Sequence, residues 1–173
     1  MAVLAVTAVL LLVFQYQFRD LEAVVTARLY GMVTPALAAH GAPIVWFGLG
    51  RPHAFGLVVT ADCSSALLVA PLCVLGIALA VPRKLALRRV CAGLAAAAAL
   101  LVTGNIARIG VIAAMVHFYG MGTGYQLGHL VLGSLLSVLS IATSLVVLVA
   151  VITGQAGRLA AALPRGRRRG ASA

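Results

Sequence analysis

Cys63, Arg108 and His129 are the residues whose side chains combine into a recognisable reaction. Cys63 stands in the stretch Thr60-Ala61-Asp62-Cys63-Ser64-Ser65-Ala66-Leu67, immediately before a long apolar run. A cysteine attacks a carbonyl carbon as its thiolate, which forms readily beside a base such as histidine. The resulting oxyanion needs a fixed donor, and a guanidinium offers permanent charge with several N–H groups. The three residue types therefore indicate acyl transfer, with Cys63 as nucleophile, His129 as general base and Arg108 as anion stabiliser.

Each of these residues also has an ordinary structural explanation. A free cysteine is most often a small buried apolar residue, which is the environment expected for Cys73 and Cys91. Arg108 in an apolar helix can extend its charge to lipid headgroups. His129 can lie at the membrane interface at the start of a helix. The catalytic interpretation therefore depends on whether the three side chains meet.

Two further residues are candidates for orienting such a site. Asn105 lies one helical turn before Arg108 on the same predicted helix face, which favours a polar interior there. Asp62 adjoins Cys63, although a carboxylate beside a thiol opposes thiolate formation. His117 is the alternative base. Zinc binding by these groups is disfavoured because no two of them have the close spacing of usual zinc sites, so neither a metal nor another cofactor is expected.

The composition is that of an integral membrane protein. The chain has 173 residues, of which 63% are hydrophobic and only 9% charged, and its mean hydropathy is +1.12. A soluble domain needs more charge than this to cover its surface. The net charge of +10 lies mainly at the ends of apolar runs, which indicates orientation in a lipid membrane and not binding of nucleic acid.

The elements that must position the candidate residues are predicted to be membrane helices. We expect an all-α fold in a single multi-span domain over residues 1–155, followed by a basic cytoplasmic tail at 156–173. The hydropathy predicts about four spans. They cover about 2–18, 64–81, 90–117 and 129–152, with an amphipathic helix at 19–30 and a glycine-rich loop at 120–128.

The segment from Gly31 to Ala61 differs in composition from the rest of the chain, because glycine and proline recur in it at a density that breaks helices. Ile44–Phe47 and Phe55–Val59 are typical of short strands around a turn at 48–52. Irregular backbone does not face lipid. We therefore expect a short irregular or β-like segment outside the membrane.

The basic residues predict the orientation of the spans. The loop at 83–89 carries four basic residues, and the tail is also basic, so both termini are expected in the cytoplasm. Cys63 and His129 then lie at the outer ends of their spans. Arg108 follows Val90 by 18 residues, about 27 Å of helix in a hydrocarbon core of about 30 Å. All three residues are thus expected at the outer face of the cell membrane.

Three short motifs surround the candidate residues: Ala61-Asp62-Cys63-Ser64-Ser65, Asn105-Ile106-Ala107-Arg108-Ile109 and Gly128-His129-Leu130-Val131-Leu132-Gly133. In this order they resemble the motifs of the exosortase/archaeosortase family of membrane transpeptidases. The resemblance covers roughly residues 25–150, although the family's cysteine motif more often continues with Ser-Gly, and its larger members have more spans.

The resemblance implies a catalytic Cys63, Arg108 and His129. It also implies substrate proteins that carry a C-terminal sorting signal, which consists of a short motif, a transmembrane helix and a basic cluster. Cleavage at the motif would leave an acyl-enzyme, and an acceptor would then take the acyl group. The alternative is a non-catalytic membrane subunit of a transport or assembly complex, in which Arg108 and His129 only form interhelical hydrogen bonds.

Overall fold

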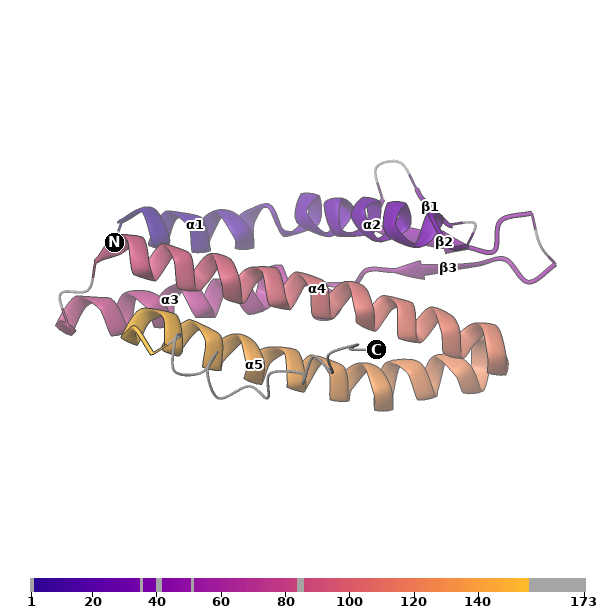
Figure 1. Cartoon of the computed structure of the whole chain (residues 1–173). Helices are drawn as coiled ribbons and strands as arrows, with labels where there is room; N and C mark the ends of the chain where they lie inside the picture. The colour runs from indigo at the N-terminus through magenta and orange to yellow at the C-terminus, as the bar shows by residue number, and fades with distance from the viewer. Residues whose placement is uncertain (1, 35, 40–41, 51, 84–85, 156–173) are drawn as a thin grey trace, which may run out of the picture.

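The structure is an elongated bundle of helices with a small sheet at one end (Figure 1). It is a computed structural model, and it describes residues 2–34, 36–39, 42–50, 52–83 and 86–155. The helices are α1 (Ala2–Val13), α2 (Gln15–Gly31), α3 (Ala66–Arg83), α4 (Leu87–Tyr119) and α5 (Gly133–Thr153). The strands are β1 (Ala36–Ala38), β2 (Ile44–Phe47) and β3 (Phe55–Val58), and the short turns are η1 (Ala61–Cys63), η2 (Gly120–Gly124) and η3 (Leu127–Leu132).

Two helices are long and apolar enough to cross a membrane. They run from Leu87 to Gly124 and from Leu127 to Thr153, and only 33% and 22% of their most apolar windows are buried inside the protein. Apolar helix surface left uncovered to this extent is what contact with lipid requires. The apolar part of α3, Ala66–Val81, is shorter.

The first predicted span, 2–18, is not one continuous helix. α1 ends at Val13 after 12 residues, which at helical rise is about 18 Å and too short for the hydrocarbon core. Phe14 leaves helical geometry with a ψ of 24°, and α2 begins at Gln15. Backbone bonds from Phe14 N to Leu10 O and from Phe18 N to Phe14 O bridge the break, so the two helices follow one another along the bundle (Figure 1).

The prediction of a glycine-rich loop at 120–128 is wrong, because this segment is helical. α4 ends at Tyr119, and Gly120 reverses the chain with a φ of +76°, a conformation that glycine adopts without strain. The returning helix begins at once with the wide π-helical turns η2 and η3 and continues as α5. α4 and α5 therefore form a tight antiparallel hairpin, which Figure 1 shows along the lower side of the bundle.

The predicted strands are confirmed, and the structure adds one more. β2 pairs antiparallel with β3, with Ile44 opposite Val58 and Phe47 opposite Phe55. β1 pairs with the other edge of β2, which gives the order β1-β2-β3. The sequence left β1 unassigned because three residues, Ala-Leu-Ala, carry too short a pattern.

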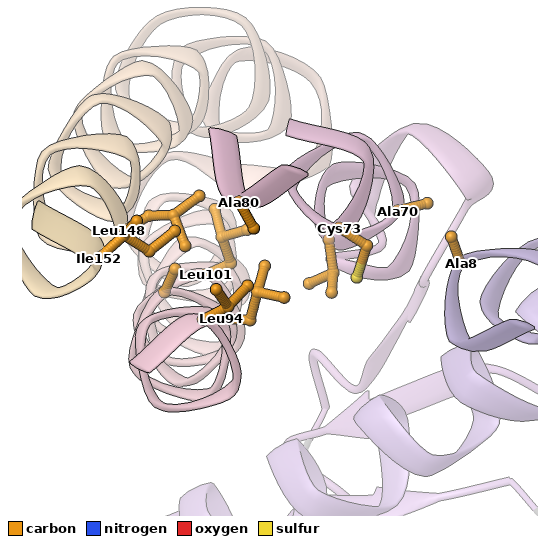
Figure 2. Close-up of a cluster of buried hydrophobic side chains, with 11 residues drawn as sticks. Ala8, Ala70, Cys73, Ala80, Leu94, Leu101, Leu148 and Ile152 are labelled. Carbon is orange, nitrogen blue, oxygen red and sulfur yellow. The ribbon is translucent and has the colours of Figure 1, made fainter. Parts of the chain in front are cut away.

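Two apolar clusters hold the bundle together, one near each end. The first joins α1, α3, α4 and α5, as Figure 2 shows, and includes Leu94, Leu101, Leu148 and Ile152. The second packs α2 and the sheet against a later part of α4 and includes Val45, Leu57, Ile109, Ile112 and Val116. On α4 the buried polar residues Asn105 and Arg108 lie between these two sets. The predicted basic tail at 156–173 lies outside the described residues.

Candidate active site

Cys63 lies in the short turn between the sheet and α3. β3 ends at Val58, and the 3-10 turn η1 then ends at Cys63 itself, whose N–H donates to the Thr60 carbonyl at 3.1 Å. α3 begins at Ala66. The thiol is buried, with 8% of the residue exposed. A turn fixed between a strand and a helix holds the sulfur in a defined position.

His129 approaches Cys63 from the hairpin that α4 and α5 form. It lies in the π-helical turn η3, and its ring stacks on Tyr125 with ring centroids 5.2 Å apart and an angle of 17°. Its Nε2 lies 3.7 Å from the Cys63 Sγ, within hydrogen-bonding distance for sulfur. π-Helical turns are rare and frequently occur at functional sites. Here the turn and the stacked tyrosine orient the imidazole toward the thiol.

Arg108 completes the group from α4. Its Nη2 lies 3.5 Å from the same His129 Nε2, and only 9% of the residue is exposed. Gly133 provides room for this side chain, because a Cβ at that position would lie 3.1 Å from the Arg108 Nε. The Nε is buried and has no partner in the described part of the chain. A buried guanidinium with an unused donor is available to an anionic group in the site.

The same His129 nitrogen faces both a guanidinium and a thiol. A guanidinium donates hydrogen bonds and cannot accept them, so Arg108 can donate to Nε2 only in the tautomer that carries its proton on Nδ1. In that tautomer the one lone pair of Nε2 can accept either from Arg108 or from the Cys63 thiol. The structure thus brings together the three residues that the motifs single out.

Glu22 is the site residue that the sequence reasoning missed. Its carboxylate is buried, with 3% of the residue exposed. Four hydrogen bonds end on it: Ser64 Oγ at 2.9 Å, Ser65 N at 3.2 Å, Ser65 Oγ at 2.6 Å and Asn105 Nδ2 at 3.2 Å. As part of the helix predicted at 19–30, Glu22 was expected on an amphipathic surface. The signal that could have found it is the apolar sequence that follows it, Ala23-Val24-Val25.

The remaining candidates are the two proposed orienting residues, Asn105 and Asp62, and the alternative base, His117. Asn105 is buried and donates to Glu22, one turn before Arg108 on α4. Asp62 lies in η1, but its side chain is outside the described residues. His117 lies farther along α4, with its ring against Phe118 and beside a different pocket. The structure therefore pairs Cys63 with His129 and not with His117.

A pocket of about 260 Å³ opens beside the sulfur. Cys63, Asn105 and Arg108 line it together with three serines spaced by one turn on the returning helix, Ser134, Ser137 and Ser140. Each serine hydroxyl donates to a carbonyl of its own helix. Each hydroxyl oxygen can still accept a further hydrogen bond, and the pocket lining combines these polar groups with apolar side chains such as Leu68 and Leu101.

A larger and mostly apolar pocket of about 470 Å³ lies between the sheet and α4, lined by residues that include Tyr30, Phe47 and His117. The Tyr30 hydroxyl donates to the Ile106 carbonyl at 3.2 Å, and burial raises the pKa of this phenol above its ordinary value. The tyrosine therefore remains a protonated donor that joins α2 to α4 near the candidate site.

Within the described residues, no three histidine, cysteine, aspartate or glutamate side chains come close enough to hold a metal ion. Comparison of the chain with protein-family models, with curated proteins and with solved structures gave no significant match. The site itself offers a thiol, an imidazole whose Nε2 faces that thiol, and a buried guanidinium.

Proposed function

We propose that this protein is a membrane-embedded cysteine transpeptidase or protease. It cleaves proteins that carry a C-terminal sorting signal and transfers them to an acceptor. The observation that carries this proposal is the contact of Cys63 Sγ and Arg108 Nη2 with the same His129 nitrogen, at 3.7 and 3.5 Å. The order of the three motifs along the sequence, which resembles that of the exosortase/archaeosortase family, supports it.

The first half of the reaction forms an acyl-enzyme. His129 Nε2 takes the thiol proton, and the Cys63 sulfur attacks the carbonyl carbon of the scissile peptide bond. Arg108 stabilises the negative oxygen of the tetrahedral intermediate with a charged N–H donor. When the C–N bond breaks, the imidazolium of His129 gives its proton to the leaving amine. The substrate is then held to Cys63 as a thioester.

The second half of the reaction transfers the acyl group. An acceptor with an O–H or N–H group enters beside the thioester, and neutral His129 removes its proton as it attacks the carbonyl carbon. Arg108 again stabilises the oxyanion. The C–S bond breaks, and the proton on the imidazole returns to the Cys63 sulfur. The chemistry permits water, a lipid amine or a glycan hydroxyl as acceptor.

We place the reaction at the outer face of the cell membrane, with about four spans and both chain termini in the cytoplasm. The basic residues at 83–89 and 156–173 support this orientation. In Figure 1 the start of α1 and the end of α5 lie at the end of the bundle where α3 meets α4, while the sheet lies at the other end. The substrate motif would then meet Cys63 outside the cell, where exported proteins are exposed.

The free edge of β3 is a suitable place for the substrate motif to bind as an added strand. The Val59 N–H donates to Pro43 O on the β2 side, and alternate residues of an antiparallel strand face the same partner. Gly56 and Val58 therefore direct their N–H and C=O groups to the other edge. β3 leads directly into the turn that carries Cys63, so a peptide along this edge extends toward the sulfur.

The proposal is tested by replacing Cys63 with alanine and following sorting-signal proteins of the same cell. The Cys63→Ala chain should reach the membrane at the normal level, while the substrate proteins accumulate with their C-terminal helices uncleaved. Cys91→Ala is the matched control, because this cysteine lies near the start of α4 and is exposed, not buried as expected from its sequence. Normal processing by Cys63→Ala would instead favour a non-catalytic membrane subunit.

A further inference from the structure

We propose that Glu22 is a positioning residue of the active site, which fixes the relative places of Cys63 and Arg108 without touching the substrate. This inference rests on the proposed function, since it assigns Glu22 a part in the same reaction. Glu22 lies on α2, before the region that carries the three motifs. If the inference is correct, the N-terminal helix pair is part of the catalytic apparatus and not only a membrane anchor.

The carboxylate of Glu22 joins three separate elements. On α2 it is itself buried, and it accepts bonds from both serines that follow Cys63 and from Asn105 on α4. A carboxylate is suited to this place because it is an acceptor with about four lone-pair sites. Its four partners use this capacity, and each is a donor that would otherwise be buried without a partner.

On the Cys63 side, Glu22 serves as the cap of α3. The first N–H groups of a helix lack partners within the helix, and a negative group there is favourable. The Ser65 N–H donates to Glu22 Oε1, while Ser64 Oγ donates to Oε2 and also accepts from the Ala66 N–H at 3.3 Å. Cys63 is the residue immediately before this capped turn, so the position of the carboxylate sets the position of the sulfur.

On the Arg108 side, Glu22 acts through Asn105. Arg108 follows Asn105 by three positions on α4, so the two lie on one face, and the Asn105 amide donates to Glu22 Oε1 at 3.2 Å. Glu22 and Arg108 are the charged side chains in the buried set of the described residues. A buried charge alone is costly. The negative Glu22 therefore offsets the positive Arg108 across one asparagine and helps to keep the guanidinium in the site.

A purely structural carboxylate and a positioning carboxylate differ in one measurable way. A structural residue changes how much of the protein folds. A positioning residue changes how the groups of the folded site act on each other. Because Cys63 and Arg108 both face His129 Nε2, a change in their relative places should alter the effect of His129 on the thiol. The reaction of Cys63 with iodoacetamide reports this interaction without any substrate. In a Cys73→Ala, Cys91→Ala background, Cys63 is the single reactive thiol of the purified full-length chain.

The experiment is a double-mutant cycle on the alkylation rate. With Glu22 present, His129→Ala should slow alkylation at neutral pH by roughly tenfold or more, because the base is removed. With Glu22→Ala, the same His129→Ala change should alter the rate less than twofold. Glu22→Gln keeps an acceptor oxygen, so His129→Ala should still slow alkylation by nearly the normal factor in this variant. Asp20→Asn removes an acid two residues earlier on α2 and should leave this factor unchanged.

Two results would overturn the inference in different ways. If His129→Ala slows alkylation equally with and without Glu22, the carboxylate does not position the pair, although the proposed function stands. If His129→Ala has no effect even in the unaltered site, the base of the proposed reaction is lost and the inference fails with it. Should Glu22→Ala not fold, Ser64→Ala and Asn105→Ala each remove one hydrogen bond to Glu22. In each of them His129→Ala should slow alkylation by a smaller factor than in the unaltered site.

Discussion

At the scale of single residues, the site consists of side chains that are far apart in sequence and meet at one nitrogen. Cys63, Arg108 and His129 come from a turn, a long helix and a π-helical turn, and His129 Nε2 faces both of the others. Residue type and motif order single out these three residues, and the structure brings their side chains close together. Glu22 could not be predicted in the same way, because an acid among arginines on a helix has the pattern of a solvated surface, and its partners lie 42 to 83 residues away.

The histidines provide the sharpest test at this scale. His129→Ala should reduce the rate of substrate processing by roughly 10²–10⁴-fold, the usual contribution of a general base. His117→Ala should change it by less than about twofold, because His117 lies at another pocket. The measurement is the rate of precursor loss at equal membrane levels of the two variants. Loss of processing in His117→Ala alone would transfer the role of base to that residue.

At the scale of elements, the α4–α5 hairpin decides whether His129 reaches Cys63. Its glycines were interpreted as a loop because glycine breaks helices in water. Gly124 and Gly128, spaced by four residues, instead lie on the face of the returning helix that contacts α4, and small residues allow membrane helices to approach closely. A Cβ on Gly128 would lie 2.9 Å from Ile112 Cα on α4. The strands were predictable because their turn residues and β-branched apolar residues gave two consistent signals.

The close approach of the hairpin predicts a specific defect in Gly104→Ala. A Cβ on Gly104 would collide with Ser140 Oγ on α5, so the helices must separate, at a cost of about 1–3 kcal/mol. Thermal unfolding in detergent should show a lower Tm, and processing should fall because Arg108 lies one turn farther along α4. Gly122→Ala is the control, since a Cβ there meets nothing within 4 Å. An equal loss of Tm and of processing in both variants would show that the loss of glycine flexibility, and not the contact with Ser140, is the cause.

The proposed strand addition predicts the effect of proline at the free edge of β3. Val58→Pro removes an N–H that faces away from β2, so the pairing within the sheet is kept while one bond to the substrate is lost. Such a bond contributes about 0.5–1.5 kcal/mol, which corresponds to a rise in KM of roughly twofold to tenfold. Val58→Ala removes the exposed side chain but keeps the N–H, and its KM should be nearly normal. Equal KM values for the two variants would exclude pairing at this residue.

At the scale of the whole molecule, the buried polar site lies between two apolar clusters along the bundle. The turn that carries Cys63 follows β3, so the site adjoins the sheet, and a pocket opens beside the sulfur. Composition and hydropathy predicted the membrane class, and the structure has two helices that are long enough to span. The break after Val13 was not predicted, because Gln15 and Gln17 beyond it are polar but are good helix formers, so they do not by themselves indicate that a helix ends.

The proposed orientation predicts which ends of the bundle are accessible from outside the cell. In a background without the native cysteines, Gly122→Cys at the hairpin turn should react with a membrane-impermeant maleimide in intact cells. Leu87→Cys, at the start of α4 beside the basic loop, should react only after the membrane is made permeable. Both positions are exposed on the protein, so access depends on the membrane. The reverse pattern would place the site in the cytoplasm and contradict the outer-face reaction.

The most direct test of the central claim is to intercept the acyl-enzyme with hydroxylamine. The purified chain in lipid nanodiscs is mixed with a protein that carries a C-terminal sorting signal, and the mass of the cleaved product is measured. A thioester on Cys63 is attacked by hydroxylamine, so the account predicts a product ending in a hydroxamate, and no cleavage with Cys63→Ala. A product that ends only in a free carboxylate under hydroxylamine, or cleavage that persists in Cys63→Ala, would contradict it.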